Sequence, residues 1–184
     1  MLVMKRTMLG LAALALLVFA GPLTKAYAGP HELDASARGT LEDFFHEVPG
    51  SRGLANRSAG ILVFPTVVKA GFGIGGEYGE GALLVAGRTA GYYNNVAGSF
   101  GFQLGAQARS IIIMFMTQDA LDEFYRRDGW KVGVDGSVAI VKVGAGGTID
   151  TNNIHSPVLG FIFDQKGLMY NLTLEGTKIT RIYR

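Results

Sequence analysis

The sequence predicts an α+β, β-rich fold: a glycine-rich, mostly antiparallel sheet with N-terminal helices and one helix near residues 118–127. Glycine makes up 27 of the 184 residues, about twice the ~7% usual in globular proteins. In residues 71–75 and 99–107, apolar side chains alternate with glycine or polar residues, which is the period of a β-strand. Two segments, 32–48 and 118–127, instead show helical spacing with end signals. Whether the sheet is barrel-like or a sandwich stays open.

The first 28 residues are predicted to be a cleaved secretory signal peptide. Lys5 and Arg6 precede an apolar run, and the residues at 26–28 read Ala-Tyr-Ala, an A-x-A cleavage site. The apolar run, of about 13 residues, is shorter than the ~20 that span a bilayer. The chain has no cysteine to carry a lipid. We therefore expect an exported protein, periplasmic or secreted and not lipidated; a retained N-terminal anchor is the alternative.

Residues 29–184 are expected to form a single domain, with a helical part at 29–58 and a β-rich core at 59–184. Apolar residues recur at helical spacing over residues 32–48, and Pro49 and Gly50 end that helix. Gly39 is a point where it could break, and a second short helix is expected through Leu54. The polar face of the first helix is mainly acidic, whereas membrane-surface helices are usually basic. Packing against the sheet is therefore expected for it.

The core is predicted to consist of strands around one helix. Residues 110–116 form a continuous apolar run typical of a buried strand. Thr117 is the expected N-cap of the following helix, and Gly129 the residue that stops it. Further strands are expected at 82–86, 137–143, 158–163, 168–174 and 177–183, with a turn at 164–167 and a loop at 146–156.

Eleven glycines lie between Gly71 and Gly105, and they leave one face of their strands nearly bare. Glycine weakens a strand by itself, so another sheet, a helix or a ligand is expected to approach that face closely. Gly71, Gly73 and Gly76 also match the G-x-G-x-x-G pattern. A dinucleotide site needs a helix directly afterwards and an acidic residue about 20 positions later. Neither is present, so nucleotide binding is not expected.

Composition excludes several classes of function. Losing Lys5, Arg6 and Lys25 with the signal peptide changes the net charge from +2 to −1. Nucleic-acid binding requires a basic excess, so no nucleic-acid partner is expected. Without cysteine there are no thiolate nucleophiles or cysteine–zinc sites. The three histidines are isolated, and no paired carboxylates or nucleophile motif can be placed. We therefore expect a non-enzymatic protein without catalytic residues, bound metal or cofactor.

Several segments resemble one known family when taken in order. They are GILVFP at 60–65, KAGFGIGG at 69–76, YYN at 92–94, FGFQLGAQ at 100–107 and LEGT at 174–177. Together they resemble the SYLF family of small lipid-binding domains. The resemblance spans residues 55–184 and implies phospholipid binding, with phosphoinositides bound by eukaryotic members and actin by fungal ones. A phospholipid or membrane surface is the expected partner, and actin binding is only a family-level possibility.

The expected lipid site combines basic residues with aromatic ones. Lys69 precedes the glycine run, whose accessible backbone amides could hold an anionic headgroup. Lys131 is the second candidate, because an exposed indole of Trp130 beside it would suit a bilayer interface. Tyr92 and Tyr93 are adjacent in a strand, so one is expected to point inward and the other outward. Ordinary surface lysines and a core tryptophan are the alternative. A structural or host-facing protein-interaction module without lipid specificity is the second function considered.

Overall fold

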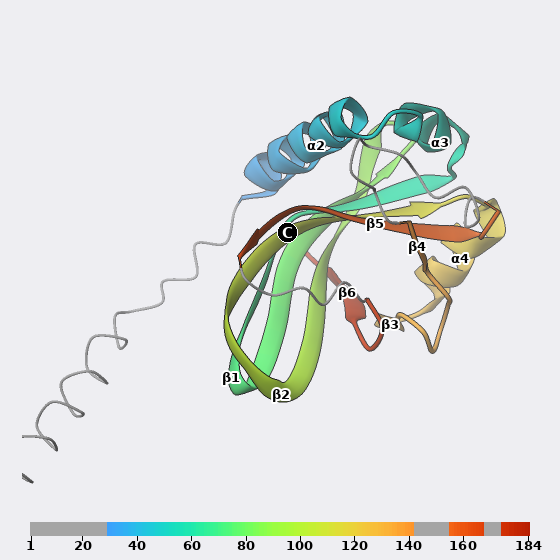
Figure 1. Ribbon diagram of the computed structural model, residues 1–184. Coiled ribbons are helices and arrows are strands. Elements are labelled where there is room, and N and C mark those ends of the chain that lie inside the picture. Colours follow the sequence, from blue (N-terminus) through green and yellow to red (C-terminus); the bar gives the residue numbers. More distant parts are fainter. Residues whose placement is uncertain (1–28, 142–154, 168–173) are drawn as a thin grey trace, which may run out of the picture.

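The computed structural model describes residues 29–141, 155–167 and 174–184 and shows an α+β protein built on one strongly curled sheet (Figure 1). The predicted signal peptide at 1–28 lies outside the described residues. So do residues 146–154 of the expected loop and residues 168–173 of one expected strand. The fold class predicted from the sequence is confirmed.

Two helices lie on one face of the sheet and a third on the other (Figure 1). Helix α2 (Pro30–Glu47) begins with proline at its first position and continues through Gly39 without a break. Helix α3 (Ser51–Arg57) follows after Gly50, whose φ of 86° suits glycine. Helix α4 (Gln118–Arg126) starts at Thr117, whose side chain accepts a hydrogen bond from the amide of Ala120. The predicted N-cap is therefore confirmed.

The six described strands form a single sheet in the order β3-β6-β2-β5-β4, with β1 paired to β2. Only β4 and β5 run parallel, so the expected mostly antiparallel arrangement is confirmed among these strands. One curled sheet also favours the barrel-like architecture over a sandwich. The strands are β1 (Gly60–Val85), β2 (Arg88–Phe115), β3 (Trp130–Lys131), β4 (Ala139–Val141), β5 (Val158–Gly167) and β6 (Lys178–Ile182).

Strands β1 and β2 form a long hairpin that occupies much of the fold. They contain 26 and 28 residues and join at Ala86 and Gly87, both with positive φ, as in a two-residue hairpin loop. The strand expected separately at 82–86 is thus the end of β1. The turn expected at 164–167 is also wrong, because β5 continues to Gly167. There it pairs with Gln107, since the edge of β2 offers hydrogen bonds to that point.

The hairpin curls until β1 meets itself. A Cβ added at Gly79 would lie 2.7 Å from Cγ2 of Val67 and 2.8 Å from the carbonyl oxygen of Thr66. At Gly81 it would lie 2.6 Å from Cδ1 of Phe64. Glycine is required here because two stretches of one strand cross at contact distance. The close approach expected at a bare glycine face is therefore confirmed at these two positions, and the approaching element is the sheet itself.

Apolar side chains fill both sides of the curled sheet. On one side they come from α2, α3 and the adjacent sheet face, with Phe44 packing edge-on against Phe161 at a ring-centroid distance of 4.8 Å. The other side contains α4 and an aromatic group formed by Tyr93, Phe115, Phe124 and Trp130. Because most of the sheet is covered on both faces, any uncovered part of a face is informative about function.

Candidate functional site

One uncovered part of the sheet carries a row of four residues from four strands. The register places Lys131 of β3 opposite Lys178 of β6, Lys178 opposite Val96 of β2, and Val96 opposite Tyr78 of β1. Residues paired in this way share one face of a sheet, and neighbouring strands lie about 4.8 Å apart. The row therefore spans about 14 Å, with two cationic residues at one end and two apolar residues at the other.

The apolar end of this row opens into a groove of about 530 Å³. Two stretches of β1, residues 65–70 and 76–80, supply most of its wall, and the beginning of α2 and residues 96–97 of β2 supply the rest. Three large apolar side chains in it are unusually accessible: Val68 is 46% exposed, Val96 44% and Tyr78 41%. A concave apolar surface of this size matches the range of small-molecule sites. Its lining includes Leu33, Ser36, Thr66, Val68, Ala70, Glu77, Tyr78, Glu80, Val96 and Ala97.

The cationic end has no carboxylate on either lysine side chain among the residues that the structure describes. Both lysines are exposed. Asp135 is close by, but it accepts hydrogen bonds from the backbone amide of Lys131 and from Arg127. Like charges directly opposite one another on paired strands are destabilising. An anion between the two ammonium groups would relieve that repulsion.

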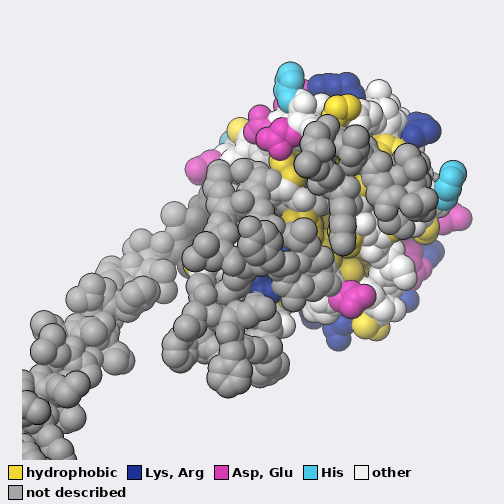
Figure 2. All heavy atoms as spheres, viewed as in Figure 1, with side chains coloured by type: hydrophobic (Ala, Val, Ile, Leu, Met, Phe, Trp, Pro, Cys, Tyr) yellow, Lys and Arg dark blue, Asp and Glu magenta, His cyan; other side chains and the backbone are white. Residues whose placement is uncertain are grey.

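The acidic groups near the groove are partly neutralised. Glu80 forms an ion pair with Arg184, and its other carboxylate oxygen accepts a hydrogen bond of 2.7 Å from the hydroxyl of Tyr78. On the face seen in Figure 2, acidic and basic side chains are interspersed with apolar ones and no single charge dominates. Recognition by bulk charge is therefore not supported on this face, as expected from the near-neutral composition.

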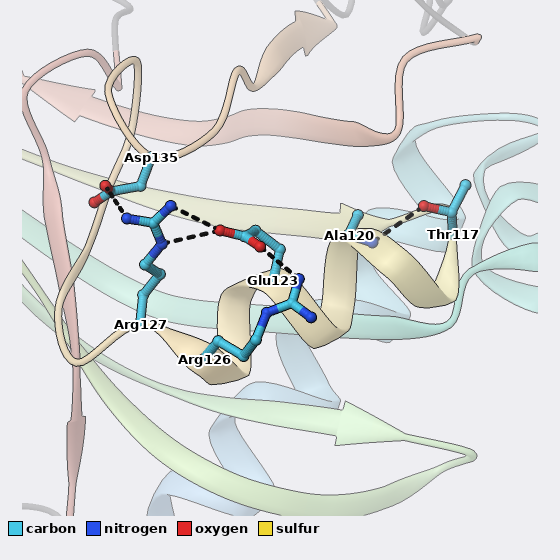
Figure 3. A network of polar contacts seen from close by, with 6 residues as sticks. All are labelled: Thr117, Ala120, Glu123, Arg126, Arg127 and Asp135. Carbon is cyan, nitrogen blue, oxygen red and sulfur yellow. Dashed lines mark hydrogen bonds and ion pairs between the residues drawn. The ribbon is translucent and has the colours of Figure 1, made fainter.

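The basic residues at the end of α4 are held in a separate surface network (Figure 3). Glu123 accepts hydrogen bonds from Arg126 and Arg127, and Arg127 also reaches Asp135. These hydrogen bonds hold the pKa of Glu123 below its ordinary value. Both guanidinium groups are thus engaged with carboxylates, which supports their expected role as helix-end residues rather than as an anion site.

The structure separates the two lysines predicted as site residues. Lys131 belongs to the four-residue row. Lys69 pairs with Gln107 and, by strand alternation, lies on the opposite face of β1 from Val68 and Ala70, which line the groove. It is half-buried and has no ion pair with any residue in the described ranges. A lipid contact by Lys69 remains a prediction, at a place distinct from Lys131.

The expectation of an exposed indole is wrong. Trp130 is 2% exposed and packs edge-on against Phe115 and Phe124, because it pairs with the buried Ile179 on the inner face of β6. It is the core tryptophan of the alternative interpretation. Its neighbour Lys131 points outward, as strand alternation requires.

The two tyrosines lie on opposite faces, as predicted, but neither is fully exposed. Tyr93 is buried beside Phe124, and that burial raises its pKa to about 12. Tyr92 is partly buried against the helix side of the core. Burial, with the nearby carboxylate of Asp34, raises the pKa of Tyr92. The outward tyrosine expected to form a binding surface is therefore packed near α2.

Three residues of the row were not identified from the sequence. Lys178, Val96 and Tyr78 belong to segments separated by many residues, and only the strand register aligns them with Lys131. Each also resembles an ordinary exposed strand residue. No pattern in the sequence would have identified these residues as neighbours without knowledge of the strand pairing.

The described residues show neither a helix long and apolar enough to cross a bilayer nor a group of three side chains suited to hold a metal ion. What the site offers chemically is two cationic groups beside an apolar groove. Such a surface suits a molecule with an anionic end and a hydrocarbon end.

Comparison with known families matches residues 96–182 to a family described as Ysc84, the Las17-binding protein actin regulator. The chain carries a SYLF (Ysc84) domain. This finding confirms the resemblance stated from the sequence. The matched segment of the SYLF domain runs from Val96 to Ile182, so it includes two members of the row besides Val96, namely Lys131 and Lys178. The motifs at 60–76 lie before it. A comparison with curated proteins finds no match.

Proposed function

We propose that this SYLF protein is exported and binds anionic phospholipid at the four-residue row, without catalysing a reaction on it. The proposal rests on the strand register, which places Lys131 and Lys178 side by side. The same row of paired residues extends to Val96 and Tyr78. The two ammonium groups would hold the phosphate, and the groove beside Tyr78 would take acyl carbons. The predicted signal peptide supports export, and a periplasmic or secreted location is part of the proposal.

Charge magnitudes make the proposal reasonable for a nearly neutral protein. A basic residue near an anionic membrane surface contributes about 1 kcal/mol, which screening weakens within a Debye length. Two lysines would thus increase partitioning about 30-fold. The groove adds apolar burial that is independent of salt. Binding should therefore weaken with salt without vanishing.

The test is co-sedimentation of the protein from Gly29 to Arg184 with phosphatidylcholine liposomes that contain rising fractions of phosphatidylglycerol. The double variant K131Q/K178Q should bind anionic liposomes about 30-fold more weakly. The matched control is R57Q/R88Q, which removes the same charge from two exposed residues away from the row. Equal binding by the two double variants would refute the lysine site, and absence of binding to every liposome would refute the membrane-surface function.

A protein-interaction module is the second candidate, because the description of the matched family names a protein that it binds, Las17. In that case a protein partner would bind saturably without any dependence on lipid. Actin binding remains a family-level possibility. The liposome experiment separates the two functions, since a protein-binding module would show no preference for anionic lipid.

A further inference from the structure

The loop that follows β3, residues 132–136, presents an apolar side chain that the proposed lipid site does not use. Val134 is 78% exposed, and among the large apolar side chains that the structure describes only Tyr183 is more exposed. Single exposed apolar residues are common on soluble proteins and need no explanation by themselves. Val134 differs from them because its loop holds it in one place, and because that place adjoins the two lysines of the row.

Backbone hydrogen bonds close this loop on itself. The amides of Val134 and Asp135 both donate to the carbonyl oxygen of Lys131, at 3.2 and 2.9 Å. The amide of Gly133 donates to the carbonyl oxygen of Gly136 at 2.9 Å. A turn closed in this way keeps the Cα atoms of residues 131 and 134 within about 7 Å of each other. Val134 is therefore a fixed neighbour of Lys131.

Side-chain contacts fix the loop on the body of the protein. The carboxylate of Asp135 accepts hydrogen bonds from the backbone amide of Lys131 at 2.8 Å and from Arg127 at 3.2 Å (Figure 3). A Cβ added at Gly136 would lie 2.7 Å from Cζ2 of Trp130, so this end of the loop lies directly against the buried indole. The loop thus has its conformation before any partner binds, and little ordering cost opposes binding.

The same loop is joined to β6, which carries the second lysine. The amide of Val132 donates to the carbonyl oxygen of Thr177 at 3.0 Å, and the carbonyl oxygen of Val132 accepts from the amide of Gly176 at 3.2 Å. Thr177 directly precedes Lys178 in the chain. Both lysines of the row are therefore held next to one rigid loop, and Val134 is the apolar side chain at its tip.

We propose that Val134 inserts into the interfacial region of an anionic bilayer while the two lysines contact lipid phosphates. This inference rests on the proposed phospholipid-binding function and adds to it a second apolar contact. The groove beside Tyr78 lies at one end of the row and Val134 at the other, with the cations between them. Contact at both ends fixes the orientation of the domain on the membrane.

The charges around the loop explain why an apolar contact is needed. Asp135 is engaged by Arg127, and the side chain of Glu175 approaches the loop at Gly133, where an added Cβ would lie 3.7 Å from its Cγ. Attraction for anionic lipid is therefore confined to the side of the loop that carries the lysines. Weak membrane signals become effective when two of them act together, and an apolar insertion beside a pair of cations is such a combination.

The backbone of the loop can enter the interface without losing hydrogen bonds. The amides of Gly133, Val134 and Asp135 all donate within the loop. Unpaired backbone groups are costly in apolar surroundings, but these bonds remain made when the tip is buried. Because the tip carries one apolar side chain beside a lysine, the insertion is shallow. The lysine stem can extend along the apolar region and keep its ammonium group among the phosphates.

The first test places a fluorescent side chain at the tip. The protein contains one tryptophan, Trp130, which is buried and supplies a constant background. V134W should show blue-shifted emission on liposomes that contain phosphatidylglycerol, and quenching by lipids brominated on their acyl chains. A90W is the matched control, because Ala90 is exposed and lies outside the loop and the row. A90W should bind the same liposomes and show neither change.

The second test measures the contribution of the valine to binding. V134S should co-sediment with anionic liposomes about tenfold more weakly than the wild type, whereas A90S should bind unchanged. Because V134S keeps both lysines, the salt dependence of its binding should match that of the wild type, and K131Q/K178Q should lose most of that dependence. The melting temperatures of V134S and A90S should equal that of the wild type, since both positions are exposed.

The outcomes separate this inference from the function on which it rests. If the wild type binds anionic liposomes while V134W shows neither change and V134S binds fully, the insertion of Val134 is refuted and the lipid function stands. Weaker binding by V134S without quenching of V134W by brominated lipids would also refute insertion, because the contact would then involve headgroups alone. If the wild type binds no liposome, both proposals are refuted.

Discussion

Arg109 and Glu77 form a buried ion pair of 2.7 Å, although the strand register places Arg109 opposite Val67, ten residues before Glu77 in β1. The pair thus connects the two halves of one hairpin across its interior. It exists only because the glycine-rich middle of the hairpin curls (Figure 1). A contact between Glu77 of β1 and Arg109 of β2, which are far apart in the strand register, makes the curl a specific structural state rather than gradual sheet twist.

Breaking this pair from one side should destabilise the protein strongly. E77L removes the carboxylate that pairs with the buried Arg109 guanidinium, and breaking a buried pair from one side typically costs about 3–5 kcal/mol. The double variant E77L/R109M removes both charges and should recover most of that loss. Urea unfolding of the four proteins in the cycle measures both effects. If E77L/R109M were as unstable as E77L, the expected recovery would be absent, and the loss in E77L could not be attributed to the buried charge of Arg109.

Substitution of Gly81 tests the crossing of β1 over itself. In G81A the new methyl group would lie 2.6 Å from Cδ1 of Phe64, in addition to its contact with the backbone at Val63. Backbone cannot yield as a flexible side chain does, so we expect a loss of about 1–3 kcal/mol or more. G98A is the control, because an added Cβ there meets nothing within 4 Å. Similar stability of the two variants in urea would contradict the crossing.

The buried hydroxyl of Tyr93 should respond to alkaline pH. Burial raises its pKa to about 12, above the ordinary tyrosine value of 10.0. The unfolded chain therefore releases this proton first, and stability present below pH 10 is lost as the pH rises through about 12. Ultraviolet difference titration should show one tyrosine that ionises at an unusually high pH, and this transition should be absent in Y93F. The stability of Y93F should also fall less steeply with pH over this interval. An unchanged titration curve would contradict the burial.

The Glu123 network should respond to acid in the opposite sense. Hydrogen bonds from Arg126 and Arg127 hold its pKa below the ordinary glutamate value of 4.5. Its contribution is therefore present above about that pH and is lost as the pH falls through the lowered value. NMR titration of the Glu123 carboxyl carbon checks this directly. R126Q/R127Q should return the pKa towards its ordinary value; D122N, a nearby carboxylate outside the two hydrogen bonds, is the control.

The apolar groove can be tested separately from the lysines. V68D introduces a charge at a side chain that is already 46% exposed, so the fold should tolerate it. Desolvating that carboxylate against acyl chains is unfavourable, and we expect phospholipid binding to fall about tenfold. A90D is the matched control, because Ala90 is also exposed and lies outside the groove lining and the four-residue row. Equal liposome binding by V68D and A90D would exclude the groove as an acyl site.

Much of the fold was predictable because its signals are local. The helical spacing and the end signals at Pro49–Gly50 and Thr117 depend on neighbouring residues, and α2 and α4 follow them closely. The buried run at 110–116 likewise became the end of β2. The sequence-based predictions were wrong where strand pairing determines the secondary structure. Residues 164–167 have turn chemistry, yet the free hydrogen-bonding edge of β2 extends β5 through them.

By itself, the sequence determined the composition, the near-neutral charge, the main helices and the family. Only the tertiary structure decided which side chains meet. Register aligned Lys131 with Lys178, Val96 and Tyr78, placed Lys69 on another face and buried Trp130. The curl of the hairpin gathered Glu77, Asn95, Gln107 and Arg109 in one interior. The physical reason is that strand pairing and sheet curvature depend on contacts between distant residues, which local sequence patterns do not encode.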